Sequence, residues 1–148
     1  MAYRTGRLGI YGWPLLLAFA ACAPDGTAAP ATDSEGLTPL AVFEQAFRDR
    51  VSDLPVAQEG ALVRILADDT AGDRHQRMIV QLANGQTLLI AHNIDLAARV
   101  PGPAKGKMLR FSGEYVYNDE GGLVHWTHRD PAGAHADGWL EYEGARYW

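Results

Sequence analysis

The sequence predicts a small all-β domain preceded by a single N-terminal helix. Asn84-Gly85 separates two stretches of alternating apolar residues, which is a strong hairpin signal. Gly60 and Gly113 fall within the first and fourth expected strands, where a small barrel has to bend sharply. Three strands, a short helical or irregular link and two further strands follow the order of an OB-fold barrel. We therefore expect an OB-fold-like five-stranded barrel plus a C-terminal hairpin, with a small open sandwich as the alternative.

Length and composition agree with one domain. The chain has 148 residues, of which 47% are hydrophobic and 21% charged, so that one modest core can form. Its only cysteine is Cys22, near the N-terminus. The folded part therefore offers no disulfide, no thiolate catalyst and no cysteine-based zinc site.

The first 21 residues predict an export signal. They contain Arg4 and Arg7 but no acid, followed by an apolar run that is short for a membrane span. Cys22 directly after Ala20-Ala21 resembles the lipobox of bacterial lipoproteins, where the cysteine is lipidated, although Phe19 stands where an aliphatic residue is usual. We expect a lipoprotein signal peptide at 1–21 and an exported protein of the cell envelope or periplasm. Ala23 favours outer-membrane sorting; ordinary signal cleavage and an uncleaved anchor are the alternatives.

The charge of the remaining chain bears on its partners. Removing Arg4 and Arg7 leaves 11 basic residues against 18 acidic ones, a net charge of −7. Nucleic-acid binding usually requires an excess of Lys and Arg, because neutralised phosphates dominate the affinity. The negative charge disfavours nucleic acid, and we expect a glycan, a peptide or an envelope protein as partner, with the membrane reached through the lipid anchor.

Residues 22–37 and 38–55 predict a flexible tether followed by a helix. The first segment is rich in Ala, Pro, Thr and Gly without periodicity. Thr38 is a candidate cap and Pro39 suits the first helical position. Apolar residues then recur at helical spacing, which predicts a helix over about 39–52 that packs on the barrel or closes one end. These apolar residues are Leu40, Phe43, Phe47 and Val51.

Residues 56–148 make up the expected OB-like β domain. Alternating apolar residues and turn signals predict its strands and its link. The expected strands span 58–68, 75–83, 86–92, 107–117 and 123–127, with a link at 93–99 and a last hairpin in 139–148 around Glu143-Gly144.

The candidate site centres on His125-Trp126-Thr127-His128 and the loop that follows. Residues 125–139 hold three of the five histidines and two of the four tryptophans. His75 and His92 lie at similar distances from Asn84-Gly85, so the hairpin should place them side by side at its open end, where the hairpin of the fourth and fifth strands could also bring His125. The residues expected to bind a ligand are Arg74, His75, Gln76, His92, Asn93, His125, Trp126, His128 and Asp130.

Two other interpretations of the same residues stay open. Imidazoles and a carboxylate would suit a divalent metal, with His75, His92, His125 and His128 as candidates, although no cofactor is predicted. On a continuous strand His125 and His128 point to opposite faces, but a turn from Thr127 would bring His128 and Asp130 back. Alternatively His128, Asp130 and Pro131 only hold the loop through side-chain to backbone hydrogen bonds. In that case Trp126, Trp139, Tyr142 and Trp148 would simply cover the end of the barrel.

Several segments resemble a bacterial family known only as domain of unknown function 3465. The resemblance covers about residues 58–148, and the HWTH element is its most specific part. The family has no assigned activity, so the resemblance supports the fold and the exported address but implies no mechanism. The matching segments are 68–70, Gly72, 74–76, 85–87, 91–96, 113–115 and 125–128.

The favoured hypothesis is an exported OB-fold-like binding module that presents a His, Trp, Asn and Arg surface to a polar ligand. Fold analogy alone is weak support for that function. A metal-dependent hydrolase or nuclease built on the clustered histidines and a structural envelope lipoprotein are the alternatives. No nucleophile elbow, phosphate-cradling loop or H-E-x-x-H sequence is present.

Overall fold

The computed structural model describes residues 36–148. The expected signal peptide, Cys22 and most of the expected tether lie outside the described residues. Leu37, placed in the tether by the sequence prediction, is buried against the domain. In the described part of the chain, no helix has the length and hydropathy needed to cross a bilayer.

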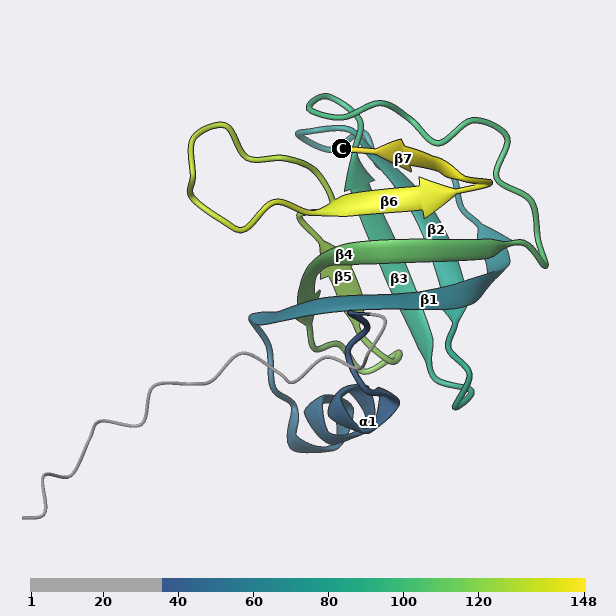
Figure 1. The fold of residues 1–148 in the computed structure, drawn as a ribbon, viewed down its shortest axis with the longest axis vertical. Coiled ribbons are helices and arrows are strands. Elements are labelled where there is room, and N and C mark those ends of the chain that lie inside the picture. Colours follow the sequence, from purple (N-terminus) through teal and green to yellow (C-terminus); the bar gives the residue numbers. More distant parts are fainter. Residues whose placement is uncertain (1–35) are drawn as a thin grey trace, which may run out of the picture.

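Five strands close into a barrel, and two more extend it (Figure 1). The barrel order is β1-β2-β3-β5-β4, closed by pairing of β1 with β4. β3 and β5 run parallel and the other pairs antiparallel. This confirms the expected OB-fold-like barrel. The elements are α1 (Leu40–Asp49), β1 (Leu54–Ile65), β2 (His75–Gln81), β3 (Thr87–Asn93), β4 (Met108–Val116), β5 (Leu123–His125), β6 (Trp139–Tyr142) and β7 (Ala145–Tyr147).

β1 closes the barrel by changing partners near its middle. It pairs with β4 from Leu54 to Ala61 and with β2 from Ala61 onward. A Cβ at Gly60 would lie 2.8 Å from the Gln81 carbonyl oxygen, so the crossing requires glycine there. The strand begins earlier than the expected 58–68, because Pro55 is tolerated where β1 pairs on one side only. The register irregularity lies between Leu62 and Arg64 rather than at Gly60.

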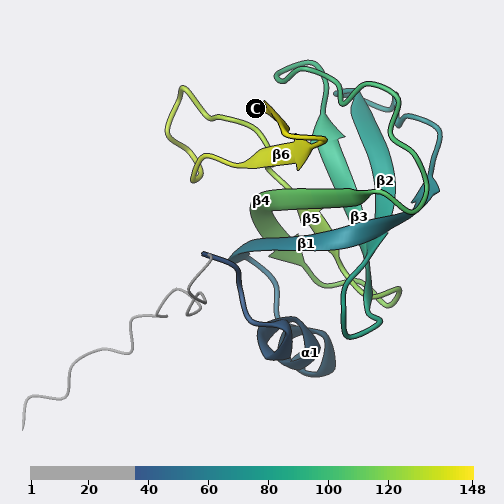
Figure 2. The same ribbon diagram turned by 45° about the vertical axis from the view of Figure 1, so that its right-hand side comes forward.

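The helix is shorter than expected and starts differently. It spans Leu40–Asp49 instead of 39–52, and Arg50 ends it in the left-handed region with φ 57°. Thr38 does not cap it. Instead the Ala57 amide donates to Thr38 Oγ1 (3.0 Å), which ties the start of the helix to β1. Figure 2 shows α1 beneath one end of the barrel.

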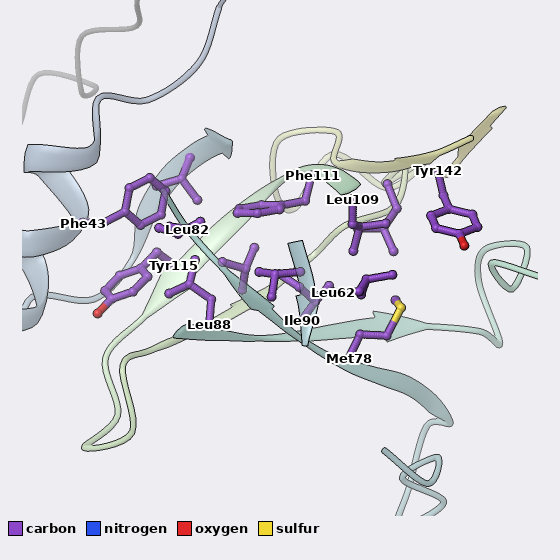
Figure 3. Packing of buried hydrophobic residues seen from close by; sticks show 14 of the residues in the cluster. Phe43, Leu62, Met78, Leu82, Leu88, Ile90, Leu109, Phe111, Tyr115 and Tyr142 are labelled. Atoms are coloured by element: carbon purple, nitrogen blue, oxygen red, sulfur yellow. The ribbon is translucent and has the colours of Figure 1, made fainter. Parts of the chain in front are cut away.

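The core runs through the barrel from this helix to the C-terminal hairpin (Figure 3). Phe43 packs edge-on against Tyr115, with ring centroids 6.1 Å apart, so it closes one end. Phe47 and Val51, expected on the same apolar face, are more than a third exposed. The alternation predicted for the hairpin is confirmed, because the apolar residues expected on its inner face are all buried while Ile79 and Leu89 between them are only half-buried. The buried residues are Met78, Val80, Leu82, Leu88 and Ile90.

The edge of β4 is shared by two segments. Its C-terminal half pairs with β5 and its N-terminal half with β6, which confirms the predicted hairpin around Glu143-Gly144. Between them residues 126–138 leave the barrel as a loop that projects from its side (Figures 1 and 2). The expected link at 93–99 is a turn without a helix. Trp126 and Trp148 are 37% and 41% exposed, so they do not cover the barrel end as core residues.

Candidate functional site at the histidine end of the barrel

The barrel topology gathers four histidines around one cavity. β3 and β5 are parallel and end at the same edge of the sheet, where antiparallel β2 begins. The cavity there has a volume of about 280 Å³, and we call it the histidine pocket. It is lined by His75, His125, His128 and His135, with Asp73, Asn93, Leu96, Trp126, Asp130 and Ala134 between them.

Gln76 and His92 lie on the other face of the same strands and point into the barrel. Gln76 donates to the Val100 carbonyl and accepts from the Val100 amide, both at 3.0 Å. His92 Nε2 donates to the Ala98 carbonyl at 3.0 Å, so its Nδ1 accepts from the Thr127 hydroxyl at 2.9 Å. Burial lowers the pKa of His92, which keeps the ring neutral. The expected neighbours are therefore together, but Gln76 and His92 do not line the pocket.

Three pocket histidines are held by the backbone through the same ring nitrogen. Nδ1 of His75, His128 and His135 lies 2.8, 2.7 and 2.7 Å from the carbonyl oxygens of Asp73, Arg129 and Ala136. A carbonyl can only accept, so Nδ1 carries the proton and the neutral ring presents Nε2 as an acceptor. In residues 36–148 these Nε2 atoms have no hydrogen-bond partner within the chain. The pocket is therefore rich in acceptors.

Trp126 stacks with two of the pocket imidazoles. Its ring stacks on His125 (4.6 Å between centroids, 26° between planes) and on His135 (4.6 Å, 7°). The backbone of Trp126 is left-handed, with φ 50°, which is uncommon for a bulky residue and is typical of functional sites. The indole therefore holds both imidazoles in place while remaining 37% exposed.

This left-handed turn also explains why His125 and His128 line one cavity. β5 ends at His125, so the turn starts at Trp126, one residue earlier than the turn from Thr127 that the sequence suggested. Thr127 is therefore buried beside His92, and His128 turns back into the pocket. There its ring meets His135 edge-on, with centroids 5.0 Å apart.

Asp130 organises the loop rather than facing a ligand freely. Its carboxylate accepts from the amides of Ala132, Ala134 and His135, and the His135 contact contributes most to lowering the pKa of Asp130. The Asp130 amide donates to the Asp137 carboxylate at 2.9 Å. Together with the contact from His128 Nδ1, this matches the loop-holding role that the sequence left open.

Two glycines close the neck of the loop. The Gly138 amide donates to the His128 carbonyl at 2.9 Å. A Cβ at Gly138 would collide with the Trp126 carbonyl oxygen, and one at Gly113 with that of His125. Neither glycine has a positive φ, so glycine is required at both positions because another part of the backbone lies too close for a Cβ atom. This close approach fixes Trp126 against β4.

Arg74 and Asn93 hold the link after β3 through hydrogen bonds. Arg74 Nε and Nη2 lie 2.7 and 2.6 Å from Asp95 Oδ1, rather than pairing with the acids of its own loop. The Arg74 amide also donates to Asp95, which is the largest of the contacts that lower the pKa of that carboxyl. Asn93 Oδ1 accepts from the Asp95 and Leu96 amides, which leaves Leu96 65% exposed at the rim.

The sequence did not indicate Leu96 or Glu114 as part of the site. Glu114 pairs directly with His125 across β4 and β5, and its Oε1 lies 3.4 Å from His125 Nε2. That nitrogen is buried and has no well-aligned hydrogen bond in the described residues. The register across the turn at 118–122 could have suggested this pair. Leu96 gave no signal, because one apolar residue in a link resembles any other.

The cluster contains no preformed metal centre. Within residues 36–148, no three His, Cys, Asp or Glu side chains are grouped closely enough to hold an ion. The predicted metal candidates are also divided, since His92 has both ring nitrogens occupied inside the barrel while His75, His125 and His128 face the pocket.

Fold and site together define a small OB-fold-like barrel protein with a histidine-lined pocket at one end. A family model described as protein of unknown function (DUF3465) matches residues 32–148, so the chain belongs to that family. The search of curated proteins gives no match.

Proposed function

We propose that the protein is an exported binding module of the bacterial cell envelope whose histidine pocket takes a polar ligand rich in hydrogen-bond donors. The observation that carries this proposal is the orientation of the imidazole rings. In three of the four, Nδ1 hydrogen-bonds to a backbone carbonyl and Nε2 is left available as an acceptor. Such groups would otherwise be satisfied by water, and a ligand with matching donors replaces it.

The pocket walls define the chemistry of that ligand. Asp73 adds a carboxylate to the imidazole acceptors, and Leu96 and Trp126 add exposed apolar surface. Hydroxyl groups of a glycan or amide and amine groups of a peptide fit this combination. A volume of about 280 Å³ is near the small end of ligand sites, so one sugar ring or one side chain fills it.

The N-terminal sequence supports the envelope address. Arg4 and Arg7, the apolar run that follows and Cys22 form the pattern of a lipoprotein signal. A lipidated Cys22 followed by a polar tether would hold the barrel near a membrane surface, within reach of envelope polymers.

Histidine ring NMR tests the binding proposal directly. The full chain is titrated with cell-wall glycan fragments and short peptides while the imidazole proton resonances are followed. We expect shifts at His75, His128 and His135, with His92 as the internal control because its ring is enclosed. The absence of shifts at His75, His128 and His135, for every ligand tried, would refute the proposal.

The second candidate function is a metal-dependent hydrolase. It is favoured by the Nδ1 contacts, because metal-binding histidines usually donate their other ring nitrogen to a carbonyl or carboxylate. Elemental analysis of the untagged full chain, with melting temperatures before and after chelator, separates the two functions. A stoichiometric transition metal whose removal lowers the melting temperature would favour the hydrolase.

A further inference from the structure

A second cavity lies beside the histidine pocket, on the outer face of β1 and β4. Its volume is about 230 Å³. Ala57 and Ser112 form its floor, and they are direct cross-strand neighbours. Thr38 lines one side, and Trp126 and Asp137 of the 126–138 loop line the other.

The hollow follows from small residues on a surface that the loop overhangs. Ala57 and Ser112 fill little space, and Gly113 next to them lets the backbone at His125 approach β4 closely. The loop neck is fixed there by the Gly138 contact with His128. The cavity is therefore built into the fold, because the elements that form it are held by strand pairing and backbone hydrogen bonds.

The charges lining this cavity all have one sign. Glu114 and Asp137 line it, and none of its lining residues within 36–148 is Lys or Arg. One carboxylate oxygen of Asp137 accepts a hydrogen bond from the Asp130 amide, and Glu114 lies beside His125. A floor of two small side chains edged by carboxylates suits a long basic side chain, whose methylene stem packs against Ala57 while its charged end meets the acids.

Trp126 connects the two cavities because it lines both. We propose that they form one binding site for an extended peptide segment of a partner protein. A Lys or Arg side chain of that segment fills the cavity at Ala57 and Glu114, and neighbouring donors of the same segment reach the histidine pocket. This rests on the proposed binding function and deepens it by naming the ligand class. The net charge of −7 expected for the chain without its signal peptide favours such a cationic partner.

The test compares three probe peptides on the full chain by isothermal titration calorimetry: acetyl-Ser-Ala-Lys-Ala-Ser-amide and its norleucine and glutamate counterparts. Norleucine keeps the stem of lysine and removes its charge. We expect the lysine peptide to bind about tenfold more tightly than the norleucine peptide, the effect of roughly one charge-assisted hydrogen bond. The glutamate peptide should bind more weakly than either.

Three variants locate the effect. Ala57→Leu fills the second cavity, and Glu114→Gln removes one of its charges. Both should reduce the preference for lysine over norleucine to less than about twofold, whereas Ala145→Leu, the same substitution on an exposed strand outside both cavities, should leave it unchanged. Circular dichroism confirms that each variant is folded.

The outcomes separate this inference from the proposed function. Equal binding of the lysine and norleucine peptides, or a preference that survives Ala57→Leu in a folded protein, overturns the peptide inference. If glycan fragments alone shift the pocket histidines, the binding module stands and the peptide inference falls. If no ligand shifts those histidines, both fail together.

Discussion

Histidines at one end of this barrel occupy two different environments. His92 lies inside, with the Ala98 carbonyl and the Thr127 hydroxyl on its two ring nitrogens. His75, on the neighbouring strand, lies outside with one nitrogen on a backbone carbonyl and the other without a hydrogen-bond partner among residues 36–148. The two residues lie close together at the hairpin end, yet their side chains face opposite sides of the sheet. The second ring nitrogen therefore distinguishes a histidine that stabilises the fold from one that is available to a ligand.

The largest effect that tests this contrast is expected for His92→Ala. The substitution leaves a cavity and removes partners from the buried Thr127 hydroxyl and Ala98 carbonyl. We expect the free energy of unfolding to fall by about 2–4 kcal/mol. Urea denaturation followed by circular dichroism measures it. A loss below about 1 kcal/mol would mean that the inner histidine is not structural.

Gly138→Ala tests whether the pocket side depends on the closed neck of the loop. The new Cβ would collide with the Trp126 carbonyl oxygen, so the backbone must shift, at about 1–3 kcal/mol. Because Trp126 positions His125 and His135, ligand affinity should fall as well. Gly133→Ala is the control. It has a left-handed φ but open space around it, so it should cost about 1–2 kcal/mol and leave the affinity unchanged.

The next effect depends on pH and comes from His92. Its pKa is lowered by burial from the ordinary 6.5, so the unfolded chain binds this proton more tightly than the folded chain does. The stabilising contribution is therefore full above about pH 6.5 and is lost as the pH falls toward the folded pKa. Asp95 and Asp130, whose pKa values are lowered from 3.8, lose their contribution only at lower pH.

Melting temperatures between pH 7.5 and 5.5 measure this dependence. The melting temperature of the parent should fall as the pH is lowered across that range. His92→Gln, if folded, has no imidazole at position 92, so its melting temperature should fall less. An equal decline in both proteins would show that His92 is not the source of the pH dependence.

The sequence predicted the barrel well because its signals are local and strong. Asn84-Gly85 sets the register of β2 and β3, and this register places His75 beside Asn93 and Gln76 beside His92. The prediction assigned faces to the apolar residues of that hairpin but did not extend the alternation to Gln76 and His92, which it grouped with His75 in one site. Burial at the barrel end depends on Val100, which returns from a long link and bonds Gln76. Such a contact between residues 24 apart leaves no local pattern in the sequence.

The loop shows the same limit. The density of histidine and tryptophan at 125–139 indicated a site, and Asp130 was among the residues considered for holding the loop. The direction of each side chain, however, is set by the left-handed turn at Trp126, a non-glycine residue for which such a turn is not expected. Thr38 was misassigned for a related reason, because its hydroxyl meets β1 across 19 residues instead of its own helix.

A smaller change is expected for Arg74→Ala at the rim of the barrel end. Arg74 and Asp95 form an exposed ion pair, with side chains 59% and 35% exposed, so solvent screens most of its energy. The free energy of unfolding should fall by less than about 1 kcal/mol, and less still at high salt. Denaturation at two salt concentrations measures it. A salt-independent loss would mean that Arg74 supports the link after β3 by packing.

The smallest effect on stability, and the closest test of the contrast, is His75→Ala. This side chain gives up only one hydrogen bond, to the Asp73 carbonyl at the edge of the pocket, so stability should change by no more than about 0.5 kcal/mol. Ligand affinity should nevertheless fall, because one Nε2 acceptor is lost. His75→Ala and His92→Ala remove the same ring from neighbouring strands, so they are matched controls for each other. Equal losses of stability in the two variants would show that the pocket histidine His75 also holds the fold, and the pocket would then be structural.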